Sequence, residues 1–315
     1  MIVLVTHEHD LDGLGSQAII YRYFKQSHKN CEIKLLYAHY LNFIEIIRNI
    51  SNSELRPNKL IISDIGFNED FKQIFPIFKN LNNQGCEIFW FDHHLVEEEI
   101  KDYIKDLIKI YLNDPDKCAA EVVKDFYLPK DSIATKIAEF ARDTDFKTNI
   151  YKLASDLQLI IGFNKGDKNY KEKVKIVELL AKGDFQDVWF EDQLNKLQSW
   201  FEKEAKFTIE HVKFVDIENF GEIAISHAKM GGGKITILLS EKYPGSKAYI
   251  GIDKRFNEII IHSEYINCRD FAKEFEGGGH RFRAGFKYPN IFTEQDVINQ
   301  KFIDDLKSRL VKHIK

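Results

Sequence analysis

The stretch that decides the fold is MIVLVTHEHDLDGLGS, residues 1–16, where an apolar run leads into a cluster of histidines and acids. Residues 1–5 predict a short buried strand, and residues 14–26 predict the helix that follows it. Between them stand five side chains able to bind a metal: His7, Glu8, His9, Asp10 and Asp12. Gly13 and Gly15 are expected to ease the turn. Because an unpaired buried carboxylate is costly, this cluster at a strand end indicates a divalent metal site.

Two later strands are predicted to end in the same way. LIISDIG, residues 60–66, carries Asp64, and EIFWFDHH, residues 87–94, carries Asp92, His93 and His94. Ligands bind outside the carboxyl ends of parallel strands in open α/β sheets, so the three strand ends predict one site. For Asp12 taken alone, a role as helix N-cap explains the acid equally well.

The chain of 315 residues, 44% of them hydrophobic, has room for one large domain or two ordinary ones. Apolar runs alternate with amphipathic stretches up to about residue 145, which predicts a doubly wound, mainly parallel α/β sheet. Residues 187–211 predict a long amphipathic helix that joins the domains. From residue 212 strand-like runs follow, KITILLS at 234–240 among them, and predict a smaller α/β domain with a mixed sheet. The expected domains are therefore 1–186 and 212–315, with 187–211 as linker.

Composition narrows the class of partner and the compartment. A formal net charge of −4 and a pI near 6.3 give no overall basic surface for long duplex nucleic acid. The four cysteines show no CxxC spacing, which argues against a structural zinc site and fits a reducing compartment. No signal segment opens the chain, and no apolar run reaches the roughly 18 residues of a membrane span. We therefore expect a cytoplasmic enzyme with no membrane partner.

A glycine-rich stretch, EGGGH, occupies residues 276–280. Three successive glycines allow backbone N–H groups to approach an anion, and His280 adds a further donor. Taken alone, the stretch is better explained by a tight turn. Its position downstream of the three strand-end clusters favours the anion site.

The ordered set HEHDLDG, SDIG, FDHH and EGGGH resembles the DHH phosphoesterase superfamily, in the branch with a DHH-associated C-terminal domain. The resemblance spans nearly the whole chain. It implies two metal ions that share Asp64, with this set of ligands: His7, Asp10, Asp12, Asp64, His93 and Asp143. Asp145 competes with Asp143 for the last place, because both lie in the charged turn that ends the helix predicted over 133–146, and we favour Asp143. His94 would contact the scissile phosphate, and Asp92 would orient a ligand histidine through its second ring nitrogen.

The sequence departs from the commonest family pattern in two places. His7 stands three and five residues before Asp10 and Asp12, one residue less than in many members. This leaves His9 as an alternative ligand, although His7 directly ends the strand and is favoured. The second departure is IHSEYINCRD, residues 261–270, which stands where a Ser-x-Arg-Ser element often precedes the glycines. Candidate replacements for its phosphate contacts are Arg255, Arg269, Arg281 and Arg283.

The implied chemistry is phosphate-ester hydrolysis. Two divalent ions about 3.5–4 Å apart activate a bridging water and stabilise the leaving oxygen. Carboxylate-rich ligation suits manganese, with magnesium or cobalt as alternatives. The resemblance is to the compact nanoRNase branch, which implies short RNA oligonucleotides, dinucleotides or pAp as substrates and a homodimer as an assembly to test. A second phosphate would lie on the glycine loop, against Gly277, Gly278, Gly279, His280 and Arg283.

Two alternative functions share parts of this pattern. A manganese-dependent inorganic pyrophosphatase would carry the same strand-end clusters, but would have a lysine- and arginine-rich signature in place of GGGH. A nonenzymatic nucleotide-binding regulator would keep the fold without turnover. The presence of every type of metal ligand favours an enzyme over the regulator.

Overall fold

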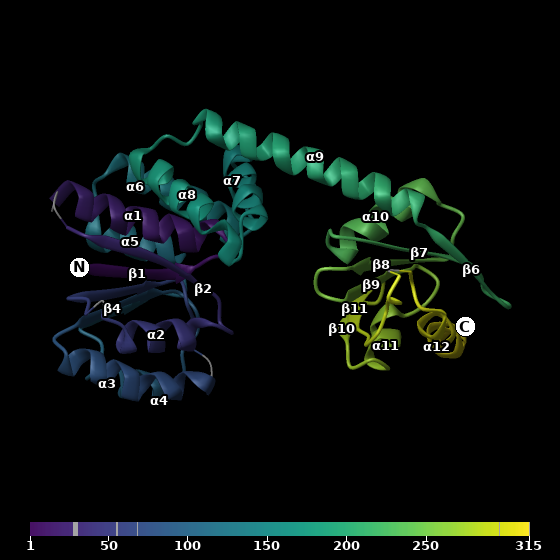
Figure 1. Cartoon of the computed structure of the whole chain (residues 1–315), viewed down its shortest axis with the longest axis horizontal. Helices are drawn as coiled ribbons and strands as arrows, with labels where there is room; N and C mark the ends of the chain where they lie inside the picture. Colours follow the sequence, from purple (N-terminus) through teal and green to yellow (C-terminus); the bar gives the residue numbers. More distant parts are fainter. Residues whose placement is uncertain (28–30, 55, 68, 296, 315) are drawn as a thin grey trace. The chain divides into compact units, whose positions relative to one another are not determined.

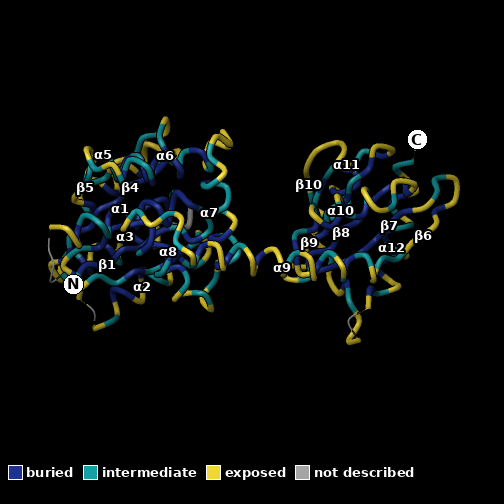
Figure 2. Tube along the Cα trace, turned by 90° about the horizontal axis from the view of Figure 1, so that it is seen from above, coloured by how far each residue is buried: buried dark blue, intermediate teal, exposed yellow. Residues whose placement is uncertain are grey.

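The computed structural model describes residues 1–315 except 28–30, 55, 68, 296 and 315. The chain divides into two compact units, residues 1–195 and 196–315, and each has its own sheet (Figure 1). Figure 2 shows that buried residues gather in the interior of each unit and exposed residues at its surface. The α/β fold class predicted from the sequence is confirmed.

Unit 1 is built on a five-stranded sheet in which every neighbouring pair is parallel. Its strands are β1 (Ile2–His7), β2 (Ile33–Ala38), β3 (Lys59–Ser63), β4 (Glu87–Asp92) and β5 (Ile110–Asn113). The strand order is β2-β1-β3-β4-β5, so the direction of winding reverses between β1 and β3. In doubly wound sheets such a reversal opens a crevice at the carboxyl ends of the strands. The first and second predicted metal clusters end these two strands.

Helices cover both faces of this sheet, as a doubly wound fold requires (Figure 1). One face carries α1 (Leu11–Ser27), α5 (Ala119–Tyr127), α6 (Ser132–Asp145), α7 (Lys152–Phe163) and α8 (Tyr170–Lys182). The other carries α2 (Phe43–Asn52), α3 (Phe75–Asn83) and α4 (Glu98–Ile104). Leu4 on β1 packs in the first core and its neighbours Val3 and Val5 in the second. The period of two residues in a strand therefore divides one apolar run between two cores.

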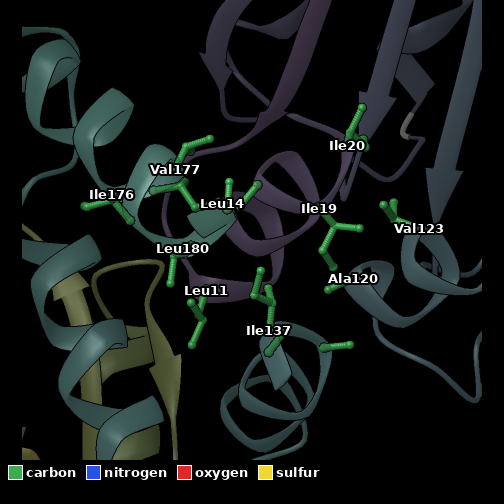
Figure 3. Packing of buried hydrophobic residues seen from close by; sticks show 14 of the residues in the cluster. Leu11, Leu14, Ile19, Ile20, Ala120, Val123, Ile137, Ile176, Val177 and Leu180 are labelled. Atoms are coloured by element: carbon green, nitrogen blue, oxygen red, sulfur yellow. The ribbon is translucent and has the colours of Figure 1, made fainter. Parts of the chain in front are cut away.

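Helix α1 is the centre of the first core. Its residues Leu11–Ile20 are all buried, because α5, α6 and α8 surround it on the side away from the sheet. Figure 3 shows Leu14 and Ile19 of α1 among side chains of these helices, including Ile137 and Val177. A helix buried on every side cannot show the one-sided pattern of a surface helix.

Helix α1 begins three residues earlier than expected, which corrects the role of its glycines. Gly13 and Gly15 lie inside the helix and not in a turn before it. A Cβ at Gly13 would stand 2.2 Å from the carbonyl oxygen of His7, and one at Gly15 would stand 2.9 Å from Cγ2 of Ile137. The glycines therefore let the helix approach the strand end and α6 closely.

Unit 2 contains a mixed six-stranded sheet, as predicted. Its strands, in the order β10-β11-β9-β8-β7-β6, pair antiparallel except for the parallel pair β7 and β8. They are β6 (Lys213–Ile217), β7 (Gly221–Ala228), β8 (Ala248–Asp253), β9 (Glu258–His262), β10 (Gly278–Gly279) and β11 (Arg283–Lys287). The helices are α10 (Gly232–Lys242), α11 (Cys268–Lys273) and α12 (Gln300–Leu310).

The strand predicted for KITILLS is wrong, because these residues lie in α10. Parallel neighbours such as β7 and β8 need a crossover connection, and α10 provides it. Ile235 and Leu239, four residues apart, are both buried against the sheet. The β-branched composition favoured a strand, and the tertiary requirement for a crossover overrides that local preference.

The long helix predicted between the domains is present. The helix predicted over 187–211 is α9 (Val188–Glu210), and the division between the units falls within it, after Asn195. Helix α4 ends at Ile104, and β5 begins at Ile110. Among the described helices, none combines the length and apolar character needed to cross a membrane.

Candidate metal centre

The histidines and acids at the ends of β1, β3 and β4 meet at the carboxyl edge of the unit 1 sheet. Three groups of possible ligand atoms, each within 4.8 Å of one another, are present: His7, Asp10 and Asp64; Asp64, Asp92, His93 and His94; and Asp12, His93 and Asp145. Asp64 belongs to two of these groups and His93 to two. The groups therefore form one continuous cluster at the point where the sheet changes its direction of winding.

Asp64 lies between two histidines. Its Oδ2 is 3.5 Å from His7 Nδ1, and its Oδ1 is 3.4 Å from His93 Nε2. The residue is buried and has a left-handed backbone, with φ of 55°, while its N–H donates to the carbonyl of Phe91 at 3.0 Å. Asp adopts this conformation more readily than most residues. The two carboxylate oxygens consequently face different parts of the cluster.

Asp12 is held by the first turn of α5. Its Oδ1 accepts from the N–H of Ala120 at 2.7 Å and its Oδ2 from the N–H of Ala119 at 2.8 Å. Its Oδ2 is also 3.7 Å from His93 Nε2. Burial and the nearby Asp64 raise the pKa of Asp12, although the N–H of Ala120 opposes that change. Asp12 thus links α5 to the cluster, besides standing in the first turn of α1.

The structure brings His7, and not His9, into the cluster. His7 Nδ1 lies 2.7 Å from Oδ2 of Asp10, whose Oδ1 accepts from the N–H of Gly13 at 2.9 Å. Burial alone would lower the pKa of His7, but hydrogen bonds to Asp10 and Asp64 raise it to about 10. The His9 ring turns toward Glu8, with 3.6 Å between Nε2 and Oε1.

His93 stands among three acids. Burial would lower its pKa, yet Asp64, Asp12 and Asp145 together raise it to about 9. The strong preference of this imidazole for a positive charge reflects the density of carboxylates around it. A divalent cation bound among these carboxylates would neutralise them in the same way as the protonated ring does.

Asp143, the favoured last ligand, lies outside the cluster. Its Oδ1 accepts from Thr148 Oγ1 at 2.5 Å and from the N–H of Ile150 at 2.7 Å, and its Oδ2 accepts from the N–H of Tyr151 at 3.0 Å. Burial opposes its ionisation, but these hydrogen bonds hold the pKa of Asp143 below its usual value. The carboxylate therefore binds donors in the turn between α6 and α7.

Asp145, and not Asp143, lies beside His93. Its Oδ2 is 3.7 Å from His93 Nδ1, and it shares a group of possible ligands with Asp12 and His93. Residues two apart on a helix point about 200° apart, so α6 can direct only one of the two acids toward β4. Of the two acids, Asp145 is the one that faces His93.

Asp92 and His94 form a second pair at the end of β4. Asp92 Oδ1 lies 2.8 Å from His94 Nδ1, and this hydrogen bond raises the pKa of His94. Asp92 is fully buried, whereas half of the His94 side chain is exposed. Asp92 thus orients His94 and not the proposed ligand His93. A Cβ at Gly66 would lie 2.9 Å from Cβ of His94, so the glycine of SDIG makes room for this ring.

Residues of α7, α8 and the loop between them, missed by the sequence analysis, support the first loop. The ammonium group of Lys173 pairs with Glu8, and the two side chains are only 1% and 4% exposed. The N–H of Gly166 also donates to Glu8, at 3.2 Å. Gln158 accepts from the N–H of Leu11 at 2.8 Å and donates to the carbonyl of His9 at 3.3 Å. These contacts fix the backbone of residues 7–12 from positions about 150 residues downstream.

The ion pair depends on an ionised Glu8. Burial would raise the pKa of Glu8, but His9, Lys173 and Gly166 lower it to about 2. Local sequence offered no signal for this pair, because a lysine in a polar stretch resembles any surface lysine.

The glycine loop of unit 2 has a structural explanation of its own. Gly278 and Gly279 form β10 against β11, and a Cβ at Gly277 would stand 2.3 Å from the carbonyl oxygen of Gly285. The N–H groups of Gly277 and His280 donate to carbonyls of Ala272 and Arg283, at 2.9 and 2.7 Å. Two of the loop's donors are therefore engaged within unit 2, and a phosphate-binding role for the loop stays a prediction.

The donor chemistry of the unit 1 cluster fits divalent metal ions. Five of the eight residues in the three groups are aspartates, and Asp12, Asp64 and Asp92 among them are buried. The groups around Asp10 and Asp12 contain one imidazole each. Oxygen-rich donor sets with imidazole suit manganese and related ions.

Comparisons with known proteins agree with this fold. The family described as DHH family, N-terminal domain, matches residues 1–145. The search of curated proteins gave no match. A solved DHH domain, from a member of a family of ribosomal proteins, has a TM-score of 0.52 at 15% identity, over 100% of this chain and 87% of that chain.

Two further solved structures are similar. CDC45 from Entamoeba histolytica has a TM-score of 0.52 at 8% identity, over 99% of this chain and 95% of that chain. Exonuclease RecJ bound to manganese has a TM-score of 0.48 at 14% identity, over 98% of this chain and 88% of that chain. At these identities the likenesses to the DHH domain and to CDC45 show a shared fold.

Proposed function

Since residues 1–145 are a DHH family N-terminal domain, we propose that this protein is a hydrolase of phosphate esters that uses two divalent metal ions. The observation that carries the proposal is the position of Asp64. Its two oxygens lie 3.4 and 3.5 Å from histidines of different strands, as a carboxylate shared between two ions would. A solvated surface acid would not be buried between two histidines in this way.

The proposed ligand set is the predicted one with a single replacement. His7, Asp10 and Asp64 would hold the first ion, and the second would be held by Asp12, Asp64, His93 and Asp145. Such ions supply a water of lowered pKa and neutralise the charge of the phosphate. The oxygen-rich set favours manganese, with magnesium or cobalt as alternatives.

His94 is the proposed substrate-contacting residue. His94 uses Nδ1 to donate a hydrogen bond to Asp92, which leaves Nε2 to donate to a phosphate oxygen or to the leaving oxygen. The buried Asp92 stabilises the protonated ring and fixes its orientation. Half of the His94 side chain is exposed, which gives a substrate access to it.

The substrate class we propose is short RNA oligonucleotides, dinucleotides or pAp, cleaved to mononucleotides. The net charge of −4 supports a short substrate, because proteins that grip extended nucleic acid neutralise many phosphates with basic residues. Binding of such a substrate would rest on the metal centre and a few specific contacts.

The test is product analysis with manganese on labelled RNAs of two to seven nucleotides, together with pAp, linear and cyclic dinucleotides, and pyrophosphate. Rapid release of mononucleotides from the shortest RNAs is expected. Turnover of pyrophosphate alone would favour the pyrophosphatase, and nucleotide binding without any turnover would favour a regulator. The control variant is Asp64→Asn, which keeps a residue tolerant of the left-handed backbone and removes the shared charge.

A further inference from the structure

A row of aromatic rings leads away from the metal centre along the ends of β1 and β2. The rings of His7 and His9 have centroids 5.1 Å apart, and those of His9 and His39 are stacked 5.6 Å apart with an interplanar angle of 19°. Tyr40 stands nearly perpendicular to His39, at 6.4 Å and 75°. The row thus starts at a proposed metal ligand and ends at a tyrosine.

The outer end of this row is exposed. Tyr40 is 65% exposed and the adjacent Leu41 is 75% exposed, while the His9 side chain is 41% exposed. A single exposed apolar residue is ordinary. Here two of them follow a stacked pair of rings beside a cluster of metal ligands, where a substrate would lie.

The loop that carries His39 and Tyr40 is fixed by its own hydrogen bonds. Asn42 Oδ1 accepts from the N–H of His39 at 2.8 Å, and the carbonyl of His39 accepts from the N–H of Phe43 at 3.0 Å. The N–H of Leu41 donates to His39 Nδ1 at 3.3 Å. The loop backbone and the His39 ring are therefore held in place before any ligand arrives, which reduces the entropy lost on binding.

We infer that His9, His39 and Tyr40 form a stacking surface for a nucleobase of the substrate whose phosphate reaches the metal centre. The inference deepens the proposed function and rests on it. Stacking suits a nucleobase because every base has a flat π face, and a sugar phosphate lacks one. The surface would favour nucleotides over simple phosphate esters without selecting one base.

The test compares the binding of 5′-AMP and ribose 5-phosphate to the full chain by calorimetry in the presence of manganese. Both ligands carry the same sugar phosphate, and only one carries a base. We expect the wild-type protein to bind 5′-AMP about tenfold more tightly. Tyr40→Ala should reduce this preference to about threefold or less, and Tyr40→Phe should retain it.

Tyr103→Ala is the matched control, since Tyr103 is also exposed, at 59%, but stacks on Phe75 of unit 1. Its preference for 5′-AMP should equal that of the wild-type protein. An equal preference in Tyr40→Ala and wild type, or none in wild type, would overturn the inference. Turnover of a diadenylate on the same samples reports on the proposed function separately. A base preference without any turnover would contradict that function and still support the stacking surface.

Discussion

Two acids at the end of α6, only two residues apart, have different partners in the structure. Asp145 faces His93, and Asp143 accepts three hydrogen bonds from residues 148–151. The pair therefore offers a matched comparison between two substitutions of the same kind, two residues apart on one helix.

Asp145→Asn is expected to weaken manganese binding and turnover by at least about tenfold, because it removes a charged ligand, and to leave the free energy of unfolding without metal nearly unchanged. Asp143→Asn should show the opposite pattern, with a loss of about 1–3 kcal/mol in the free energy of unfolding. Calorimetric titration with manganese and urea denaturation separate the two effects. Weakened metal binding in Asp143→Asn alone would restore the original assignment.

At this scale the sequence could identify residue types but not their partners. His7, Asp10, Asp12, Asp64 and His93 were all proposed as ligands from their places at strand ends, and the structure brings them together. The choice between Asp143 and Asp145 depends on the rotation of α6 about its axis, which local sequence does not specify. The partner of Asp92 was likewise decided by packing, because Gly66 admits the ring of His94 beside it.

At the scale of elements, the α7–α8 region supports the loop of residues 7–12 through a buried ion pair. Lys173→Met is expected to cost about 3–5 kcal/mol in the free energy of unfolding, because it leaves Glu8 buried and uncompensated. The double variant Glu8→Gln with Lys173→Met should recover a large part of that loss. Urea denaturation of both variants provides the measurement, and equal stability of the single and double variants would argue against the pair.

Helix α6 is tied to α1 by Asp131, which also caps α6. Asp131 accepts from Arg22 Nε at 3.0 Å and Nη2 at 2.9 Å, and its Oδ1 accepts from the N–H of Ala134 at 2.8 Å. Burial opposes ionisation, yet these bonds lower the pKa of Asp131 in the folded state. Its stabilising effect is therefore fully present above the unfolded pKa of about 3.9 and is lost as pH falls through the folded pKa.

Asp131→Asn keeps a good N-cap and removes the charge that pairs with Arg22. We expect it to lower the free energy of unfolding by about 1–2 kcal/mol at pH 7. The difference from wild type should shrink below about pH 4. Denaturation of both proteins at several pH values tests this, and a difference that does not change with pH would contradict the role of the charge.

At the scale of the whole molecule, metal binding should stabilise the unit that carries the ligands. A ligand at 100 times its dissociation constant adds about 2.7 kcal/mol, which corresponds to a rise of about 5–10 °C in Tm for a unit of this size. We expect manganese to raise the Tm of unit 1 in the full chain, and chelation by EDTA to reverse it. Asp64→Asn should show a much smaller rise in scanning calorimetry. A shift of equal size in that variant would mean that the ions bind elsewhere.

The sequence by itself determined the α/β class, the parallel sheet of unit 1, the mixed sheet of unit 2 and the gathering of histidines and acids at one sheet edge. These features follow from hydrophobic periodicity and from the placement of polar residues at strand ends, which are local properties. Only the tertiary structure decided that residues 234–240 form α10, that Asp145 faces His93 and that Lys173 pairs with Glu8. Each of these depends on which distant surface a segment packs against. The local sequence of the segment does not specify that surface.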